Sequence, residues 1–77
     1  EYPSTPIIIN ASNEILVDRF LQKKIPFLRI NSTIMDILND RNYKKYAIKE
    51  PKNIEQILQI DKWSRRSTYE KIEKKNA

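Results

Sequence analysis

The sequence predicts an all-α fold, a small bundle of three helices. The expected helices span roughly residues 6–23, 29–40 and 54–74. Between the prolines of the chain, apolar residues recur with a helical period. Proline is tolerated in the first turn of a helix but breaks its interior, and Pro6, Pro26 and Pro51 lie near the ends of these segments. The chain has no glycine, which argues against tight β-hairpins because their turns need positive φ.

The first segment combines a well-marked start with a wide apolar surface. Thr5 is the expected N-cap, and Pro6 suits the first helical position. No breaker follows before Lys23, and the apolar side chains of this stretch fall on almost every side of the helix. Such a helix is normally buried on several sides. Two further helices cannot cover it completely, so we expect another packing partner, with Phe20 and Leu21 in the contact surface.

The second segment predicts a shorter helix followed by a polar connection. Its apolar stripe consists of Ile30, Ile34, Ile37 and Leu38. Asn31 and Ser32 compete for backbone hydrogen bonds near the start, and either is a candidate cap. Residues 41–52 are polar and rich in lysine, so we expect an irregular connection there. Its expected anchors to the core are Tyr43, Tyr46 and Ile48.

The third segment begins with a capping box and contains one ion pair. Asn53 is followed three residues later by Gln56, the spacing of a capping box. Asp61 and Arg65 are four residues apart, so they can pair along the helix. Two interpretations stay open: an ordinary helix ion pair that is only partly buried, or a pair that fixes this helix to a neighbouring segment.

Two faces of the third segment carry apolar residues. The face expected to be buried holds Ile54, Ile57, Leu58, Tyr69 and Ile72. Ile60 and Trp63 fall on the opposite side, where an exposed tryptophan beside an isoleucine is typical of a contact surface. We therefore predict a second packing surface at Ile60 and Trp63.

The residue types exclude several kinds of active site. The chain has neither cysteine nor histidine, so thiol nucleophiles, Ser–His pairs and imidazole metal ligands are absent. Glu14 and Asp18 lie one helical turn apart, but such neighbours are usually solvated, and we expect no metal site. No apolar run is long enough to span a membrane. The net charge of +5 suits nucleic-acid binding, but the basic residues are scattered, which favours a solvated surface.

One stretch carries a more specific pattern. Residues 9–30 read INASNEILVDRFLQKKIPFLRI. Their asparagine motif consists of Asn10, Ala11, Asn13 and Glu14. This stretch resembles the 1-deoxy-D-xylulose 5-phosphate reductoisomerases, in which Asn-Ala-Ala-Asn-Glu is followed by a valine, a Phe-Leu pair and an isoleucine. The similarity continues into the last helix. Ser12 stands where the family has the second alanine, and Arg29 stands where it has an aspartate.

The resemblance implies a parent enzyme that converts 1-deoxy-D-xylulose 5-phosphate to 2-C-methyl-D-erythritol 4-phosphate in the non-mevalonate pathway of isoprenoid biosynthesis. That enzyme would use NADPH and a divalent metal, Mg or Mn, and would be a homodimer. Residues 1–77 would form part of its C-terminal helical bundle domain, without a preceding helix and without the nucleotide-binding and catalytic domains. The bundle would brace the catalytic domain of the same enzyme.

No family active-site motif has a counterpart in this chain, so the resemblance assigns it no catalytic, cofactor-binding or metal-binding residue. We expect the segment alone to be inactive. The last helix resembles apicomplexan versions, which implies a plastid (apicoplast) location; a bacterial source would imply the cytoplasm.

Two alternatives to this assignment depend on the surface alone. The first is a stand-alone basic helical module that binds nucleic acid or an acidic protein, with Arg65 and Arg66 beside Trp63. The second is a small interaction domain that packs on a partner through Ile60 and Trp63. The spacing of the asparagine motif favours the reductoisomerase domain over both, so we expect neither nucleic acid nor a membrane as partner.

Overall fold

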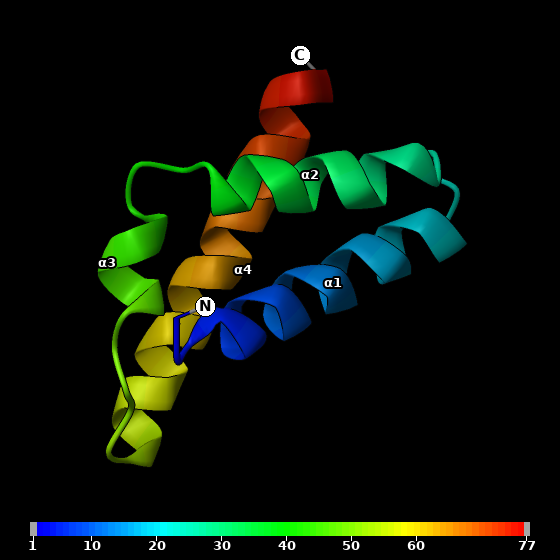
Figure 1. The fold of residues 1–77 in the computed structure, drawn as a ribbon. Coiled ribbons are helices and arrows are strands. Elements are labelled where there is room, and N and C mark those ends of the chain that lie inside the picture. The colour runs from blue at the N-terminus through cyan, green and yellow to red at the C-terminus, as the bar shows by residue number, and fades with distance from the viewer. Residues whose placement is uncertain (1, 77) are drawn as a thin grey trace.

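The computed structural model describes residues 2–76, which form four helices and no strand (Figure 1). The helices are α1 (Thr5–Leu21), α2 (Leu28–Leu38), α3 (Tyr43–Ala47) and α4 (Ile54–Asn76). The predicted all-α fold is therefore confirmed. None of the described helices is long and apolar enough to cross a membrane.

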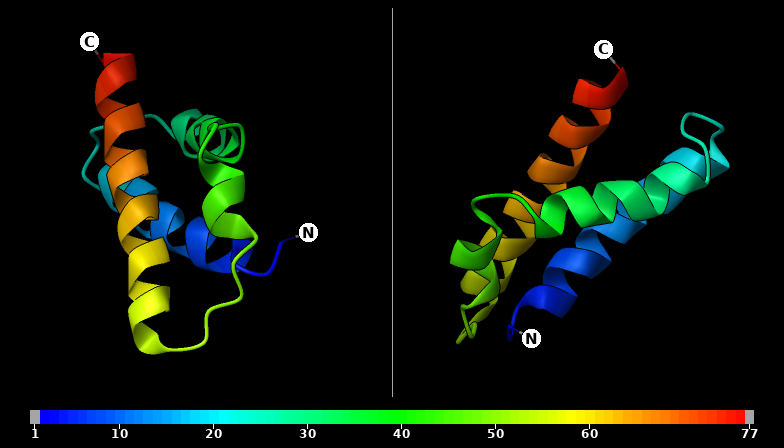
Figure 2. Two further views of the ribbon diagram at one scale, coloured as in Figure 1. Left: turned by 90° about the vertical axis from the view of Figure 1, so that its left-hand side faces the viewer. Right: turned by 45° about the horizontal axis from the view of Figure 1, so that its top comes forward.

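The helices form two layers. In Figure 1, α1 runs to a turn at the right and α2 returns above it, while α4 crosses behind both. The side view in Figure 2 separates α4 from α2 and α3. The long helix α4 packs against both α1 and α2, which also contact each other. The domain measures 37 × 22 × 20 Å, and its elongation comes mainly from α4.

The start of α1 is fixed by residues in α3 and just after it. Thr5 is the first helical residue and Ser4 is the cap, so the predicted boundary was one residue too late. The Ser4 amide donates to the carbonyl of Ala47 at 2.9 Å, and its hydroxyl donates to the carbonyl of Lys49. The Thr5 hydroxyl and the Tyr43 hydroxyl share a hydrogen bond of 2.6 Å. Thr5 thus joins two helices and does not cap its own.

The end of α1 is a Schellman-type stop built without glycine. The helix ends at Leu21, two residues before the predicted end, and Lys23 has a φ of 61°. The amide of Lys24 donates to the carbonyl of Arg19, and that of Lys23 donates to the carbonyl of Phe20, both at 2.9 Å. This pattern satisfies the last carbonyls of the helix. It places a lysine where glycine is usual.

Helix α2 starts at Leu28 and ends at Leu38, and Asn31 and Ser32 lie inside it, so neither caps it.

The polar connection contains a helix that the sequence did not predict. Within residues 41–52, five residues form α3. The side chain of Asp40 accepts a 2.7 Å hydrogen bond from the Asn42 amide just before α3 begins. Fully buried Ala47 then fixes α3 to the core.

The expected anchors of the connection divide between core and surface. Tyr43 and Tyr46 are half-buried and pack against the core, but the side chain of Ile48 is 50% exposed.

The start of α4 follows the predicted capping box with one difference. The Gln56 amide donates to the Asn53 side-chain oxygen at 2.9 Å, as expected. The Gln56 side-chain oxygen accepts from the Lys52 amide at 2.7 Å, one residue before the position that a capping box predicts.

The core consists of two apolar clusters. The first contains Ile8, Ile37, Ala47 and Ile60, and the second contains Ile15, Leu16, Ile25 and Ile72. The predicted buried face of α4 was wrong, because Ile54, Ile57, Leu58 and Tyr69 are exposed and only Ile72 of that set is buried. Ile60, predicted on an outer surface, is fully buried. Serine and threonine side chains complete the buried face of α4, and a search for apolar periodicity does not detect them.

Candidate functional site

The asparagine motif lies on α1 and is divided between two faces of that helix. Ala11 is buried against the rest of the domain, as is the adjacent Ser12, while Asn10, Asn13 and Glu14 are exposed. Among residues 2–76, neither asparagine side chain makes a hydrogen bond. The small residues of the motif therefore pack inward, and its amides face outward.

A chain of hydroxyl groups joins α1 to α4 beneath this motif. The hydroxyls of Thr68 and Ser12 are joined by a hydrogen bond of 2.9 Å. Thr68 also donates to the carbonyl of Ser64, and Ser64 to that of Ile60, both at 2.7 Å. Because these side chains are small and their hydroxyls have partners, the two helices can pack closely without an unsatisfied polar group. We call Ser12, Ser64 and Thr68 the hydroxyl seam.

The predicted pair of Asp61 and Arg65 is present and extends to α1. Arg65 Nε donates to Asp61 Oδ2 at 2.9 Å, and its Nη1 donates to Glu14 Oε1 at 3.3 Å. The hydrogen bond to Asp61, followed by that to Glu14, raises the pKa of the Arg65 guanidinium. The Glu14 side chain is largely exposed, and exposed ion pairs contribute little to stability. The pair of Asp61 and Arg65 is therefore a partly exposed helix ion pair, and Arg65 also contacts Glu14 of the neighbouring helix α1.

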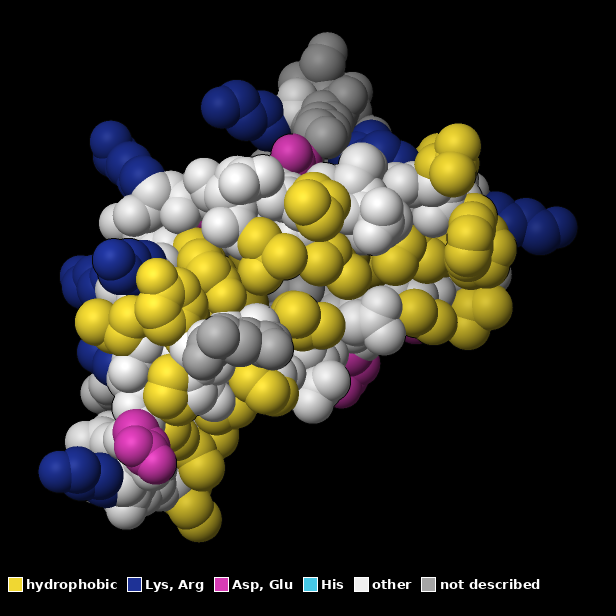
Figure 3. All heavy atoms as spheres, in the orientation of Figure 1, with side chains coloured by type: hydrophobic (Ala, Val, Ile, Leu, Met, Phe, Trp, Pro, Cys, Tyr) yellow, Lys and Arg dark blue, Asp and Glu magenta, His cyan; other side chains and the backbone are white. Residues whose placement is uncertain are grey.

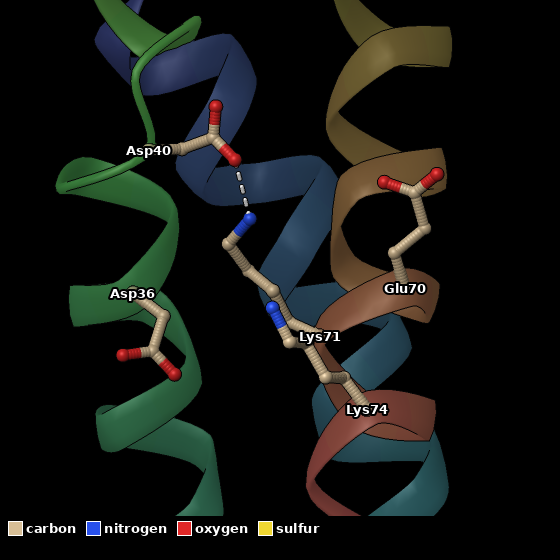
Figure 4. A pocket seen from close by; sticks show the side chains of 5 residues that line it. All are labelled: Asp36, Asp40, Glu70, Lys71 and Lys74. Atoms are coloured by element: carbon tan, nitrogen blue, oxygen red, sulfur yellow. Dashed lines mark hydrogen bonds and ion pairs between the residues drawn. The ribbon is translucent and has the colours of Figure 1, made fainter.

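A second ion pair joins Asp40, in the turn after α2, to α4 across a cleft of about 480 Å³, shown in Figure 4. Lys71 Nζ lies 2.5 Å from Asp40 Oδ2 and 3.1 Å from the Ser67 hydroxyl. Burial alone would raise the pKa of the Asp40 carboxyl, but the hydrogen bonds from Lys71 and the Asn42 amide outweigh it and lower that pKa. The sequence offered no signal for this pair, because its members are 31 positions apart.

Other charged groups line the same cleft. Asp36 lies on α2, and Lys74 lies one turn beyond Lys71 on α4. Glu70 extends from the side of α4 that faces away from Asp40 (Figure 4). Since acids and lysines are mixed, the cleft has no strong preference for a charged ligand of either sign.

Three large, strongly exposed apolar residues gather at the turn between α1 and α2. The side chains of Leu21, Phe27 and Leu28 are 71%, 67% and 80% exposed. The rings of Phe27 and the half-buried Phe20 meet edge to face, with centroids 5.6 Å apart. Figure 3 shows apolar side chains at its right-hand end, where this turn lies. We call Phe20, Leu21, Phe27 and Leu28 the turn patch.

The expected packing surface at Ile60 and Trp63 is not an exposed apolar surface. Ile60 belongs to the first core cluster. Trp63 is half-buried against that cluster and stacks on Tyr46 of α3, with ring centroids 4.7 Å apart. Ile60 and Trp63 are covered because α3 packs on the side of α4 that was predicted to be exposed. In the turn patch, Phe27 and Leu28 flank a helix start and belong to no periodic stripe, so apolar periodicity did not place them on an exposed surface.

Comparison with known proteins identifies the family. Residues 1–67 match the family model described as the DXP reductoisomerase C-terminal domain. A 1-deoxy-D-xylulose 5-phosphate reductoisomerase of Bacillus cereus is 41% identical over 69 residues, which is 90% of this chain and 17% of that protein. The chain belongs to the DXP reductoisomerase family. It spans about a sixth of the length of the curated relatives that it matches.

Two further reductoisomerases extend the comparison. That of Chlorobaculum tepidum is 37% identical over 67 residues, covering 87% of this chain and 16% of the relative. The apicoplastic enzyme of Plasmodium falciparum is 38% identical over 60 residues, covering 78% of this chain and 12% of the relative. No solved structure matches the chain.

In the part of the chain that the structure describes, no three acidic, histidine or cysteine side chains are grouped so that they could hold a metal ion. The chain has no glycine for a phosphate-binding loop.

Proposed function

We propose that this chain is the C-terminal helical domain of an enzyme that converts 1-deoxy-D-xylulose 5-phosphate to 2-C-methyl-D-erythritol 4-phosphate with NADPH, in the non-mevalonate pathway of isoprenoid biosynthesis. The observation that carries the proposal is the family match over residues 1–67. It also argues against a stand-alone basic module. The NADPH and the divalent metal would be bound by the other domains of the enzyme, so the segment alone would be inactive.

The role of this domain would be to brace the catalytic domain of the same enzyme through the turn patch. Leu21, Phe27 and Leu28 expose large apolar side chains that no other described residue covers. A contiguous exposed apolar group of this kind marks a contact surface. The relatives are about six times longer than this chain, so an enzyme of their length supplies ample protein to cover it.

The parent enzyme would be a homodimer, as in the family that the chain resembles. Its location would follow its source. The relative in Plasmodium falciparum is named as apicoplastic, which supports a plastid location if the source is an apicomplexan. The similarity to bacterial enzymes supports the cytoplasm if the source is a bacterium.

The experiment adds the 77-residue chain as a separate protein to an enzyme that lacks it. The enzyme lacking residues 1–77 should have no reductoisomerase activity, and added 77-residue chain should restore part of it. Leu21→Glu with Leu28→Glu should abolish this restoration, because burying unpaired carboxylates in an apolar contact is costly. The matched control is Ile54→Glu, at an apolar position that is 72% exposed at the far end of α4.

The outcomes separate the two parts of the proposal. If the truncated enzyme is fully active, the bracing role is wrong. If the double variant restores activity as well as the unchanged chain, the domain braces the enzyme through another surface.

A further inference from the structure

The surface between α3 and α4 carries a groove of about 270 Å³ that is lined by basic and aromatic side chains. Its lining consists of Lys45, Tyr46, Lys49, Gln59, Lys62, Trp63 and Arg66. In the space-filling view of Figure 3, several lysine and arginine side chains gather along the left-hand edge, around α3. No acidic side chain lines the groove among the described residues.

The four cations form two short rows, one from each side of the groove. Lys62 and Arg66 are four residues apart on α4, a spacing that places side chains side by side, about 5–6 Å apart. Lys45 lies in α3 and Lys49 lies two residues after its end, and the ammonium groups of both lie over the Tyr46 ring. The groove therefore presents one basic row from α4 and one from α3 and the residues that follow it.

These cations differ from the other basic residues of α4. Arg65 is paired with Asp61 and Glu14, and Lys71 is paired with Asp40. Within residues 2–76, none of the four groove cations has an acidic partner. Unpaired cations that are grouped on one surface produce a positive potential that attracts acidic partners.

The aromatic floor of the groove argues against the stacking of nucleic-acid bases. Tyr46 stacks on Trp63 with an interplanar angle of 12°. The ammonium groups of Lys45 and Lys49 also lie over the Tyr46 ring, 5.6 and 5.4 Å from its centroid. Proteins that bind single-stranded nucleic acid offer aromatic faces to the bases, but here Tyr46 is already engaged by a ring and two cations.

The groove is open to solvent, so it suits an extended partner better than an enclosed small molecule. We propose that it binds an acidic protein segment, whose carboxylates would pair with the rows formed by Lys45 and Lys49 and by Lys62 and Arg66. The stacked Tyr46 and Trp63 hold the two rows at a fixed separation. This proposal is independent of the turn patch and of the enzyme's reaction.

The test uses Trp63 as the reporter, because it is the only tryptophan in the chain and lines the groove. The 77-residue chain is titrated with a short poly-L-glutamate peptide, and separately with oligothymidylate and with inorganic triphosphate. We expect saturable binding of poly-L-glutamate that weakens as salt is added. Neither oligothymidylate nor triphosphate should bind more tightly than poly-L-glutamate.

Two charge-reversal variants locate the site. Lys49→Glu with Lys62→Glu removes one cation from each row and should weaken poly-L-glutamate binding by about tenfold or more. Lys23→Glu with Lys24→Glu makes the same change in net charge at an exposed turn away from the groove, and should weaken binding by less than about threefold. Circular dichroism checks that the variants are helical, and Lys45→Gln with Arg66→Gln replaces the first variant if it does not fold.

Three results would overturn the proposal. One is the absence of saturable poly-L-glutamate binding, and another is equal weakening in the two charge-reversal variants, which would indicate a response to net charge alone. The third is tighter binding of oligothymidylate or triphosphate, which would assign the groove to phosphates.

Discussion

Two parts of α4 are buried to the same extent by different means. Ile60 and Thr68 are both 0% exposed. Ile60 lies in an apolar cluster with Ile8 and Ile37, whereas Thr68 lies in the hydroxyl seam and bonds to Ser12. The first part is stabilised by removal of apolar area from water, and the second by close packing with satisfied hydroxyls. Full burial along one helix therefore does not require an apolar sequence.

The largest effect is expected where the apolar cluster is broken. Ile60→Ala should reduce the free energy of unfolding of the chain by about 2–5 kcal/mol, because it removes buried methyl groups and leaves a cavity. Urea unfolding followed by circular dichroism measures the change. Ile57→Ala, at a 40% exposed position on the same helix, is the control and should change the value by about 0.5 kcal/mol or less. Equal effects at the two positions would contradict the assignment of the core.

A smaller effect is expected in the hydroxyl seam. Thr68→Val keeps the shape of the side chain but removes its hydroxyl, so it should reduce the free energy of unfolding by about 1–3 kcal/mol, in part because the Ser12 hydroxyl loses its partner. Thermal unfolding measures this loss. Adding Ser12→Ala should cost less than the sum of the two single changes, since the two side chains share one hydrogen bond. If the losses in the free energy of unfolding from the two changes are strictly additive, the hydroxyls of Thr68 and Ser12 are not coupled.

The ion pair between Asp40, just after α2, and Lys71 of α4 makes the free energy of unfolding depend on pH. Asp40→Asn should reduce the free energy of unfolding by about 1 kcal/mol at neutral pH, because a half-buried lysine loses its charged partner. The Asp40 pKa is lowered in the folded chain. Its contribution is therefore present above the unfolded-state pKa of about 4, and is lost as the pH falls through the lower folded-state value.

Acid titration of stability checks the sign of this effect. The unchanged chain should lose stability below about pH 4, and the Asp40→Asn variant should lose less. Glu73→Gln, at an exposed position of α4, is the control and should change the free energy of unfolding at neutral pH by about 0.5 kcal/mol or less. An Asp40→Asn profile as steep as that of the unchanged chain would contradict the assigned role of the pair.

The smallest effect concerns the end of α1. Lys23 has a φ of 61°, a conformation that costs a residue with a Cβ about 1 kcal/mol. Lys23→Gly should therefore raise the free energy of unfolding by up to about 1 kcal/mol. Lys24→Gly, one residue later, should not raise it. Thermal unfolding of the two variants side by side distinguishes them, and stabilisation by both would point to a cause other than the Schellman-type stop.

Local patterns in the sequence predicted the features whose partners are close in the chain. The three long helices, the cap at Asn53 and the pair of Asp61 and Arg65 all depend on spacings of three or four residues, and all are present. The packing partner of Ile60 was not predicted, because α3 is too short and too polar to produce an apolar period. The pair of Asp40 and Lys71 joins distant positions, and spacing carries no information about it.

The candidate sites show the same limit. Phe20 and Leu21 were expected in a contact surface, but their association with Phe27 and Leu28 depends on how the chain turns after Lys23. Likewise, the basic residues looked scattered along the sequence. The fold brings two rows of them together because α3 packs on α4.

The central claim, that this domain braces a longer enzyme through the turn patch, is tested most directly by hydrogen–deuterium exchange. Backbone amides of residues 20–28 should exchange more slowly in the complete enzyme than in the isolated 77-residue chain. The amides at the start of α4, near Ile54 at the far end of that helix, should exchange at similar rates in both. Equal exchange of residues 20–28 in the two proteins would contradict the claim.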